Sequence, residues 1–458
     1  MLTGLHATPK PQLTLFDSVC IILGIVIGAG IYETTPLIAQ SVPDTRWLIG
    51  AWIAGGLVSL IGAVCYAELA TTYPYEGGDY VFLTRAYGRR TGFLFTWAGF
   101  WMVRPANIGA IAYIFARYAS EVWPLSPGDD GLMVYAIVAV IVLTLVNMCG
   151  VRPGKWTQNL VTVSKVLGLL LIVVIGMFLV VPRSAAPVHD LPVNGFDLNG
   201  FDLEFAMILI LFTYGGWSNI SYVAAEVRHP GKNILRSLLI GTLLVTLIYI
   251  AINLAFVWSL GFAGLAASTS AAADMVSLFH ASGAVFISIL ICITCIGNLN
   301  GMILTDARIY YALGQDHRLY RWLGTWNRQL DAPVWALVLQ AAVSLVLIIG
   351  LGGYGDAFQR LVIFSAPLHW FFFLLVAMSL VILRIKDPHV RRGYAVPGYP
   401  FIPVLFCLSA LFMLYASLTY AWEHKHPEAY WMLAAMLAGV LLSFYDPPAG
   451  NGERLTPS

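Results

Sequence analysis

Long apolar segments alternate with short polar ones along the whole chain. Each apolar segment has roughly 18 to 25 residues, enough for a helix to cross ~30 Å of hydrocarbon. Twelve such segments are predicted, over residues 14–40, 48–72, 92–118, 132–150, 157–181, 203–226, 237–259, 283–307, 334–352, 361–384, 401–421 and 429–446. The pattern therefore predicts an all-α integral membrane protein with twelve transmembrane helices, surrounded by membrane lipid.

The composition agrees with this prediction. Of the 458 residues, 59% are hydrophobic and 11% are charged, whereas soluble domains carry about 25% charged residues. The net charge is +1, and no basic stretch with interleaved aromatic residues indicates nucleic-acid binding. Residues 1–13 are polar and no small-residue cleavage site follows, so we expect no cleaved signal peptide.

Lys and Arg residues are distributed unevenly between the two sets of loops. With the N-terminus inside, 18 of the 25 lie on the inner side, and three lie within apolar segments. The outer side has only Arg46, Arg183, Arg360 and Lys425. Because cytoplasmic loops carry such an excess, the sequence predicts a multi-pass protein of the cell (inner or plasma) membrane with both termini in the cytoplasm.

The six cysteines lie within or at the ends of apolar segments. None lies in an outer loop, where an oxidising compartment would favour disulfides. Cys292 and Cys295 form a CxxC pair, but no second pair or nearby histidine completes a metal or redox site. We therefore expect no metal and no cofactor.

Glycines interrupt two segments at corresponding positions. The first contains "GIVIGAGIYETTP" (24–36) and the sixth contains "LFTYGGWSN" (211–219). Unpaired backbone groups are tolerated inside a membrane only against protein or a water-filled cavity. Interrupted helices one and six are typical of a five-plus-five inverted repeat with a substrate site at the midplane. Close helix packing through small residues is the alternative explanation.

The two breaks would expose complementary backbone groups. The N–H groups at the positive end of the outer half-helix are those of Ala29, Gly30 and Ile31. The C=O groups at the C-terminal ends of the half-helices are those near Val26, Phe212 and Gly215. The former suit a carboxylate and the latter an ammonium, and glycine, including Gly28, permits close approach. The breaks together predict a site for a zwitterion.

Several motifs resemble the amino acid–polyamine–organocation superfamily. They are "VIGAGIY" (26–32), "CYAELATTYPYEGGDYVFLTRAYG" (65–88), "VRPA" (103–106), "LFTYGGW" (211–217), "EVRHPGKNILRS" (226–237) and "CIGNLNGMILTDARIYYALGQDHRLY" (295–320). Within the superfamily, "VRPA" and "FTYGGW" are most similar to the L-type amino-acid transporter group and its prokaryotic relatives. The resemblance implies a LeuT-type fold with a ten-helix core over 14–384, two additional helices over 385–446, and cytoplasmic tails over 1–13 and 447–458.

The resemblance also implies transport of amino acids by alternating access. When the binding residues of the family are carried over to this sequence, the resemblance places the substrate carboxylate on Ala29 and Gly30. It places the amino group on the carbonyls of Val26, Phe212 and Gly215. The Phe212 ring would cover the substrate as part of the outer gate, with core packing as the alternative role. Val103 and Asn107 lie four residues apart, hence on one helical face, and would line the side-chain pocket.

The sequence departs from the family pattern in ways that loosen any inference about the substrate. Ser218 stands where the family often has Asn, and the paired glutamates are reduced to Ala225 and Glu226. Residues 117–134 lack the outer-loop cysteine by which light-chain members bind a heavy subunit. A disulfide-linked heavy subunit is therefore not expected.

Ionisable groups within a membrane are costly and usually mark function. Lys165 resembles the lysine of sodium-independent members, whose ammonium takes the place of a cation between segments one and eight. Its neighbours would be C=O groups near Gly24 to Gly28 and the polar side chain of Asn298. A lysine that merely pins two helices together is the alternative. For Glu68 and Arg104 we expect structural pairing or capping.

Two further groups leave the substrate class open. Glu33 either faces the cavity, where it would favour a cationic substrate or take a proton, or faces the outer vestibule. His369 would line the pocket, as a titrating group or as a hydrogen-bonded structural residue.

The sequence as a whole predicts sodium-independent transport of amino acids. The expected substrates are neutral L-amino acids, carried by exchange or facilitated uptake. A proton-coupled or cationic amino-acid or polyamine transporter is the alternative that Glu33 and His369 motivate. A membrane-embedded enzyme is a remote alternative, because no familiar catalytic motif is present.

Overall fold

The computed structural model describes most of the chain. The described residues are 11, 13–28, 30–75, 77–125, 129–149, 151–180, 202–280, 283–327, 329–330, 332–351, 357–423 and 428–445. Ala29, most of the predicted N-terminal tail and all of the predicted C-terminal tail lie outside them. Regular structure in these ranges is helical, apart from two isolated β-bridges.

Sixteen α-helices occur in the described ranges. In chain order they are α1 (Leu15–Val26), α2 (Gly30–Ser41), α3 (Thr45–Thr72), α4 (Asp79–Tyr87), α5 (Arg89–Ala98), α6 (Arg104–Val122), α7 (Asp129–Met148), α8 (Val151–Val174), α9 (Leu203–Thr213), α10 (Pro230–Ala267), α11 (Ala271–Phe279), α12 (Gly283–Asp316), α13 (Val334–Leu351), α14 (Ala357–Lys386), α15 (Phe401–Glu423) and α16 (Glu428–Tyr445). The π-segments are η1 (Gly99–Val103) and η2 (Ile175–Leu179), and the 3₁₀ segments are η4 (Trp217–Glu226) and η5 (Arg318–Tyr320).

Helices occupy all twelve predicted segments. Among the described residues, eight are long and apolar enough to cross a membrane, and α1 with α2 makes a ninth if the bent pair is one span. Two shorter apolar helices cover Val334–Gly350 and Met432–Phe444. The third predicted segment is occupied by α5, η1 and α6 in succession. Twelve crossings, and the division into a ten-helix core and two further helices, stay predictions.

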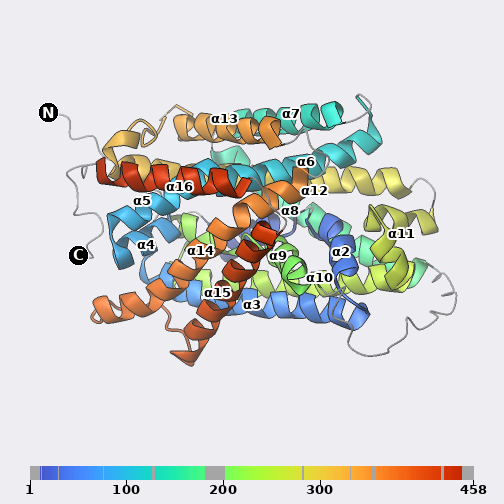
Figure 1. Cartoon of the computed structure of the whole chain (residues 1–458), viewed down its shortest axis with the longest axis horizontal. Coiled ribbons are helices and arrows are strands. Elements are labelled where there is room, and N and C mark those ends of the chain that lie inside the picture. The colour runs from blue at the N-terminus through green and yellow to red at the C-terminus, as the bar shows by residue number, and fades with distance from the viewer. Residues whose placement is uncertain are drawn as a thin grey trace.

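The broken helices lie within the helical bundle. Figure 1 shows α13 beside α7 along one edge and α3 along the opposite edge, where it packs against α10. α1 contacts α8, α10 and α12, and α2 contacts α9 and α10. α14 packs between α6 and α15, and α16 lies along α5. The arrangement surrounds both predicted breaks with protein, as unpaired backbone in a membrane requires.

Both predicted interruptions are present. The axes of α1 and α2 differ by 46° across the break between Val26 and Gly30. α9 ends at Thr213, and a turn precedes η4, in which Gly216 has a φ of +107°. This left-handed conformation is open to glycine and disfavoured for a residue with a Cβ, so a glycine allows the second break.

The half-helices form two pairs. At one end, the N–H of Leu13 donates to Glu226 O (2.8 Å) and Arg228 N–H donates to Leu13 O (2.9 Å), which joins the start of α1 to the end of η4. At the other, the Thr34 and Thr213 hydroxyl oxygens lie 3.0 Å apart and join α2 to α9. The two broken segments therefore run alongside each other, and their breaks lie close together. The inverted repeat itself stays a prediction.

Candidate functional site

A cavity with a volume of about 140 Å³ lies at the two breaks. Five of the residues predicted from the breaks line it, namely Val26, Gly28, Gly30, Phe212 and Gly215. Five predicted residues elsewhere in the chain do so as well, namely Val103, Asn107, Ser218, Asn298 and His369. Ile31 is fully buried and does not line the cavity. The structure thus brings most of the predicted substrate site to one place.

The first break is closely packed against α12 and α10. A Cβ on Gly28 would lie 2.1 Å from Asn298 Nδ2, so no larger residue fits without a shift. The Val26 carbonyl accepts hydrogen bonds from Gly28 N (2.8 Å) and from the Tyr249 hydroxyl (2.7 Å). Because a carbonyl oxygen has two lone pairs, a substrate ammonium would have to displace one of these donors from Val26.

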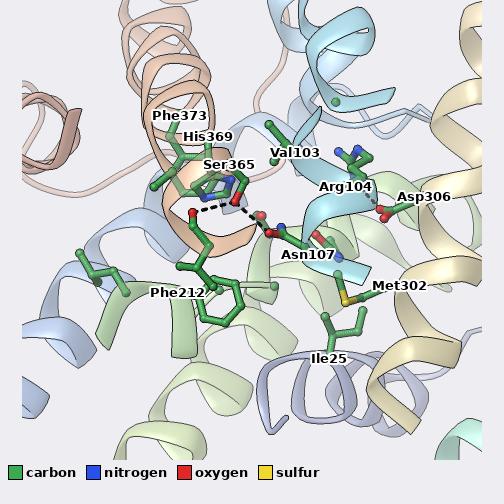
Figure 2. Close-up of a pocket in the computed structure, with 18 of the residues that line it drawn as sticks. Ile25, Val103, Arg104, Asn107, Phe212, Met302, Asp306, Ser365, His369 and Phe373 are labelled. Carbon is green, nitrogen blue, oxygen red and sulfur yellow. Dashed lines mark hydrogen bonds and ion pairs between the residues drawn. The ribbon is translucent and has the colours of Figure 1, made fainter. Parts of the chain in front are cut away.

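The second break is closed by its own turn. The Phe212 carbonyl accepts from the N–H groups of Tyr214 and Gly215, the latter at 2.9 Å, and Phe212 and Gly215 both line the cavity. The Phe212 ring is partly buried and meets Phe358 of α14 edge to face, with 5.8 Å between centroids. The ring therefore links α9 to α14, and Figure 2 shows Phe212 at the cavity.

The Lys165 ammonium lies behind the first break. Nζ donates to Gly24 O (2.6 Å) and Ile27 O (3.1 Å), and the residue is 1% exposed. The expected contact with carbonyls of this segment is present. Among the described residues, no hydrogen bond joins Lys165 to Asn298, which lies against Gly28 instead. Lys165 thus holds the end of α1 without lining the cavity.

A buried chain of polar groups forms another part of the cavity wall. Arg104 of α6 forms an ion pair with Asp306 of α12, as Figure 2 shows, and its Nη2 donates to the Tyr222 hydroxyl (3.2 Å). That hydroxyl donates to Asp79 Oδ2 (2.8 Å) at the start of α4. All four residues line the cavity. The sequence predicted structural pairing or capping for Arg104, and the ion pair with Asp306 is such a structural pairing.

The sequence reasoning missed Asp79 and Asp306. Asp306 lies inside the predicted segment 283–307, so the cost of charge in a membrane was a signal that could have found it. Asp79 lies in a polar connection between two segments, where a carboxylate is unremarkable. Only the folded chain brings it to the cavity.

The remaining ionisable groups are positioned by partners. Glu33 of α2 accepts a hydrogen bond from Arg117 Nη1 at its Oε2 (2.9 Å) and does not line the cavity. Glu68 of α3 accepts from Arg384 Nε (2.8 Å), in agreement with the expected structural pairing. The His369 ring lies on Phe373, with 4.6 Å between centroids, at the cavity wall.

α6 and α14 contribute a polar pair. The Ser365 hydroxyl lies 3.2 Å from Asn107 Oδ1 and 3.1 Å from Val362 O, and Figure 2 shows Ser365 and Asn107 turned toward each other beside His369. The cavity therefore combines residues of two helix breaks with a few polar side chains, a lining typical of sites for small polar ligands.

Comparison with known proteins decides the family. A family model described as amino acid permease matches residues 13–442. The chain belongs to the amino acid permease family. The resemblance to the amino acid–polyamine–organocation superfamily and to its L-type group is thereby confirmed.

Curated permease relatives cover nearly the whole chain. The serine/threonine exchanger SteT of Bacillus subtilis (strain 168) is 28% identical over 89% of this chain and 91% of its own. The large neutral amino acids transporter small subunit 2 of Oryctolagus cuniculus is 28% identical over 95% and 80%. The b(0,+)-type amino acid transporter 1 of Mus musculus is 25% identical over 95% and 88%. This permease is accordingly a multi-pass membrane protein of a family of transporters, and not of a family of enzymes.

Proposed function

We propose that this permease carries neutral L-amino acids across the cell membrane by alternating access, without sodium, through exchange or facilitated uptake. The observation that carries the proposal is the contact of Lys165 Nζ with Gly24 O and Ile27 O at the first break. Carbonyls at a helix end attract a small cation. An ammonium group fixed on them supplies that positive charge from within the chain.

The substrate backbone binds between the two breaks in this proposal. The carboxylate accepts from N–H groups at the first break, those of Gly30 and its neighbour Ala29, and not from Ile31, which does not line the cavity. The ammonium contacts the carbonyls at the half-helix ends, those of Val26, Phe212 and Gly215. It displaces a donor where the carbonyl already accepts two hydrogen bonds, as at Val26. The Phe212 ring covers the substrate as the outer half-helices close on it.

The preference for neutral substrates rests on the residues assigned to the side-chain subsite, none of which is a carboxylate. Glu33 is engaged with Arg117 outside the cavity. Val103, Asn107, Ser218 and His369 line the side-chain subsite in this proposal. The names of two relatives, a serine/threonine exchanger and a large neutral amino acids transporter, agree with neutral substrates.

Three sequence predictions belong to the same proposal. They are the cytoplasmic position of both termini, the five-plus-five inverted repeat, and activity without a disulfide-linked heavy subunit. The last rests on the lack of a cysteine in residues 117–134.

A thermal-shift screen of the purified permease in sodium-free buffer tests the proposal. The ligands are the twenty amino acids and common polyamines. A ligand at 100 times its Kd stabilises the folded state by about 2.7 kcal/mol, so neutral L-amino acids should raise the melting temperature. Stabilisation by polyamines or basic amino acids alone would contradict it.

A further inference from the structure

Asp79 is a buried carboxylate at the cavity without a cation in direct contact. The residue is 2% exposed and lines the cavity at the start of α4. Its Oδ2 accepts a hydrogen bond from Tyr222. The Tyr66 hydroxyl beside the carboxylate also stabilises its charged form, and among the described residues Oδ1 has no other partner. The groups next to this carboxylate are therefore neutral hydroxyls.

The charges around the cavity do not cancel. Arg104 is matched by Asp306, with which it forms the ion pair. Asp79 reaches the Arg104 guanidinium only through the Tyr222 hydroxyl. A buried carboxylate without a cation in contact is expensive. Such a group either becomes neutral by taking up a proton or binds a cation.

The surroundings of Asp79 favour uptake of a proton. Burial raises the pKa of the Asp79 carboxyl to about 6, against the opposing effects of Tyr222, Arg104 and Tyr66. From α12, Asp306 is held by Arg104, and from α14, His369 lines the same cavity. The Arg104 guanidinium would repel a second organic cation bound at Asp79, whereas a neutral carboxyl experiences no such repulsion.

We propose that Asp79 is a proton-binding site of the transport cycle, open to the substrate cavity. A proton from the aqueous phase binds Oδ1, beside the Tyr66 hydroxyl, while Tyr222 keeps its hydrogen bond to Oδ2, and the proton leaves again when the carboxyl is exposed to water. This inference rests on the proposed transport function and adds a linkage between transport and pH that Glu33 does not provide.

The test is uptake into sodium-free proteoliposomes between pH 5 and pH 8, with a neutral amino acid that stabilises the protein. In the parent, uptake should rise as the pH falls through about 6, by up to about 90-fold over the range, because the protonated fraction of Asp79 grows from about 1% to about 90%. Asp79→Asn should give a flat profile. Tyr222→Phe removes a hydrogen bond to the charged form, so the midpoint should move to higher pH. Glu33→Gln removes a buried carboxylate outside the cavity and should leave the midpoint of the pH profile unchanged.

Substrate-induced thermal shifts of the same variants show that they are folded and bind. A flat parental profile, or a folded Asp79→Asn with the parental midpoint, would overturn the proton site while leaving the transport function intact. If Asp79→Asn selectively loses lysine uptake and keeps the pH profile for the neutral substrate, the site holds a substrate ammonium and the proton proposal is wrong. A parent that binds no amino acid at any pH would overturn the transport function, and this site with it.

Discussion

Lys165 and Arg104 are two cations buried in the same helical bundle, and they are stabilised in opposite ways. Arg104 has a carboxylate partner, Asp306, and a phenolic acceptor, Tyr222. Lys165 donates only to main-chain oxygens, Gly24 O and Ile27 O, and no carboxylate of the described residues lies within ion-pair distance of it. One cation depends on side chains of other helices, and the other depends on the backbone conformation at a helix break.

The difference separates a structural pair from a conformation-dependent contact. The Arg104–Asp306 ion pair joins α6 to α12 and survives any movement that leaves these helices together. The carbonyls that bind Lys165 point toward it only while α1 ends where it does. We infer that a change of geometry at the first break alters the hydrogen bonds of Lys165 directly. The two cations should therefore respond differently to mutation.

Removal of the Arg104 charge, which leaves the buried Asp306 carboxylate unpaired, should have one of the two largest effects on stability. Arg104→Met leaves Asp306 buried without its cation, which costs about 3–5 kcal/mol, and should lower the melting temperature sharply in a thermal-shift assay. The double variant Arg104→Met with Asp306→Leu should recover most of the loss, since neither charge remains. A double variant as unstable as the single one would show that the pair has another role.

Removing Lys165 should have an effect of similar size on stability and a large one on transport. Lys165→Ala leaves two buried carbonyls without their donor, at about 1–3 kcal/mol each, and removes the positive charge at the break. Proteoliposome uptake should fall by more than about tenfold. Normal uptake by a folded Lys165→Ala would reduce this lysine to a structural pin.

Crowding the first break should impair substrate binding. Gly28→Ala brings a methyl group against the Asn298 amide, which must move within the cavity that both residues line, so we expect the substrate-induced thermal shift to be reduced. Gly50→Ala in α3 is the matched control, because a Cβ there meets nothing within 4 Å, and it should behave like the parent. Equal binding by both variants would mean that the Gly28 backbone is not part of the site.

The smallest effect is expected at the half-exposed ion pair of Glu33 and Arg117. Arg117 is 45% exposed at its side chain, so solvent screens its attraction for Glu33, and Glu33 itself is 8% exposed and lies outside the cavity. Glu33→Gln should therefore leave substrate preference unchanged in competition uptake. A switch between neutral and cationic substrates would place Glu33 in the transport path and favour the cationic alternative.

The fold was predictable to the extent that it depends on local pattern. Apolar segments of the right length locate the helices, and the glycines near Gly28 and Gly216 locate the two breaks, because backbone conformation there depends on single residues. The contact of Lys165 with carbonyls of the first segment followed from the family resemblance. α13 and α16 have short apolar stretches, and hydropathy alone does not decide whether these cross the membrane.

What the sequence could not provide are partners that meet across helices. The Tyr249 hydroxyl of α10 donates to the Val26 carbonyl, more than 200 positions away in the chain. Arg117 forms an ion pair with Glu33 outside the cavity. Asp79 gains its role only where α4 meets η4 and α6. No local periodicity encodes such contacts, since each depends on how separate helices pack.

The central claim, that Lys165 replaces an external cation, is tested most directly by substrate binding with sodium replaced by choline at constant ionic strength. The parent should bind the stabilising neutral amino acid with the same Kd in both salts, because the Lys165 ammonium already occupies the carbonyls of Gly24 and Ile27. A Kd that weakens by about tenfold or more when sodium is withdrawn would contradict the account.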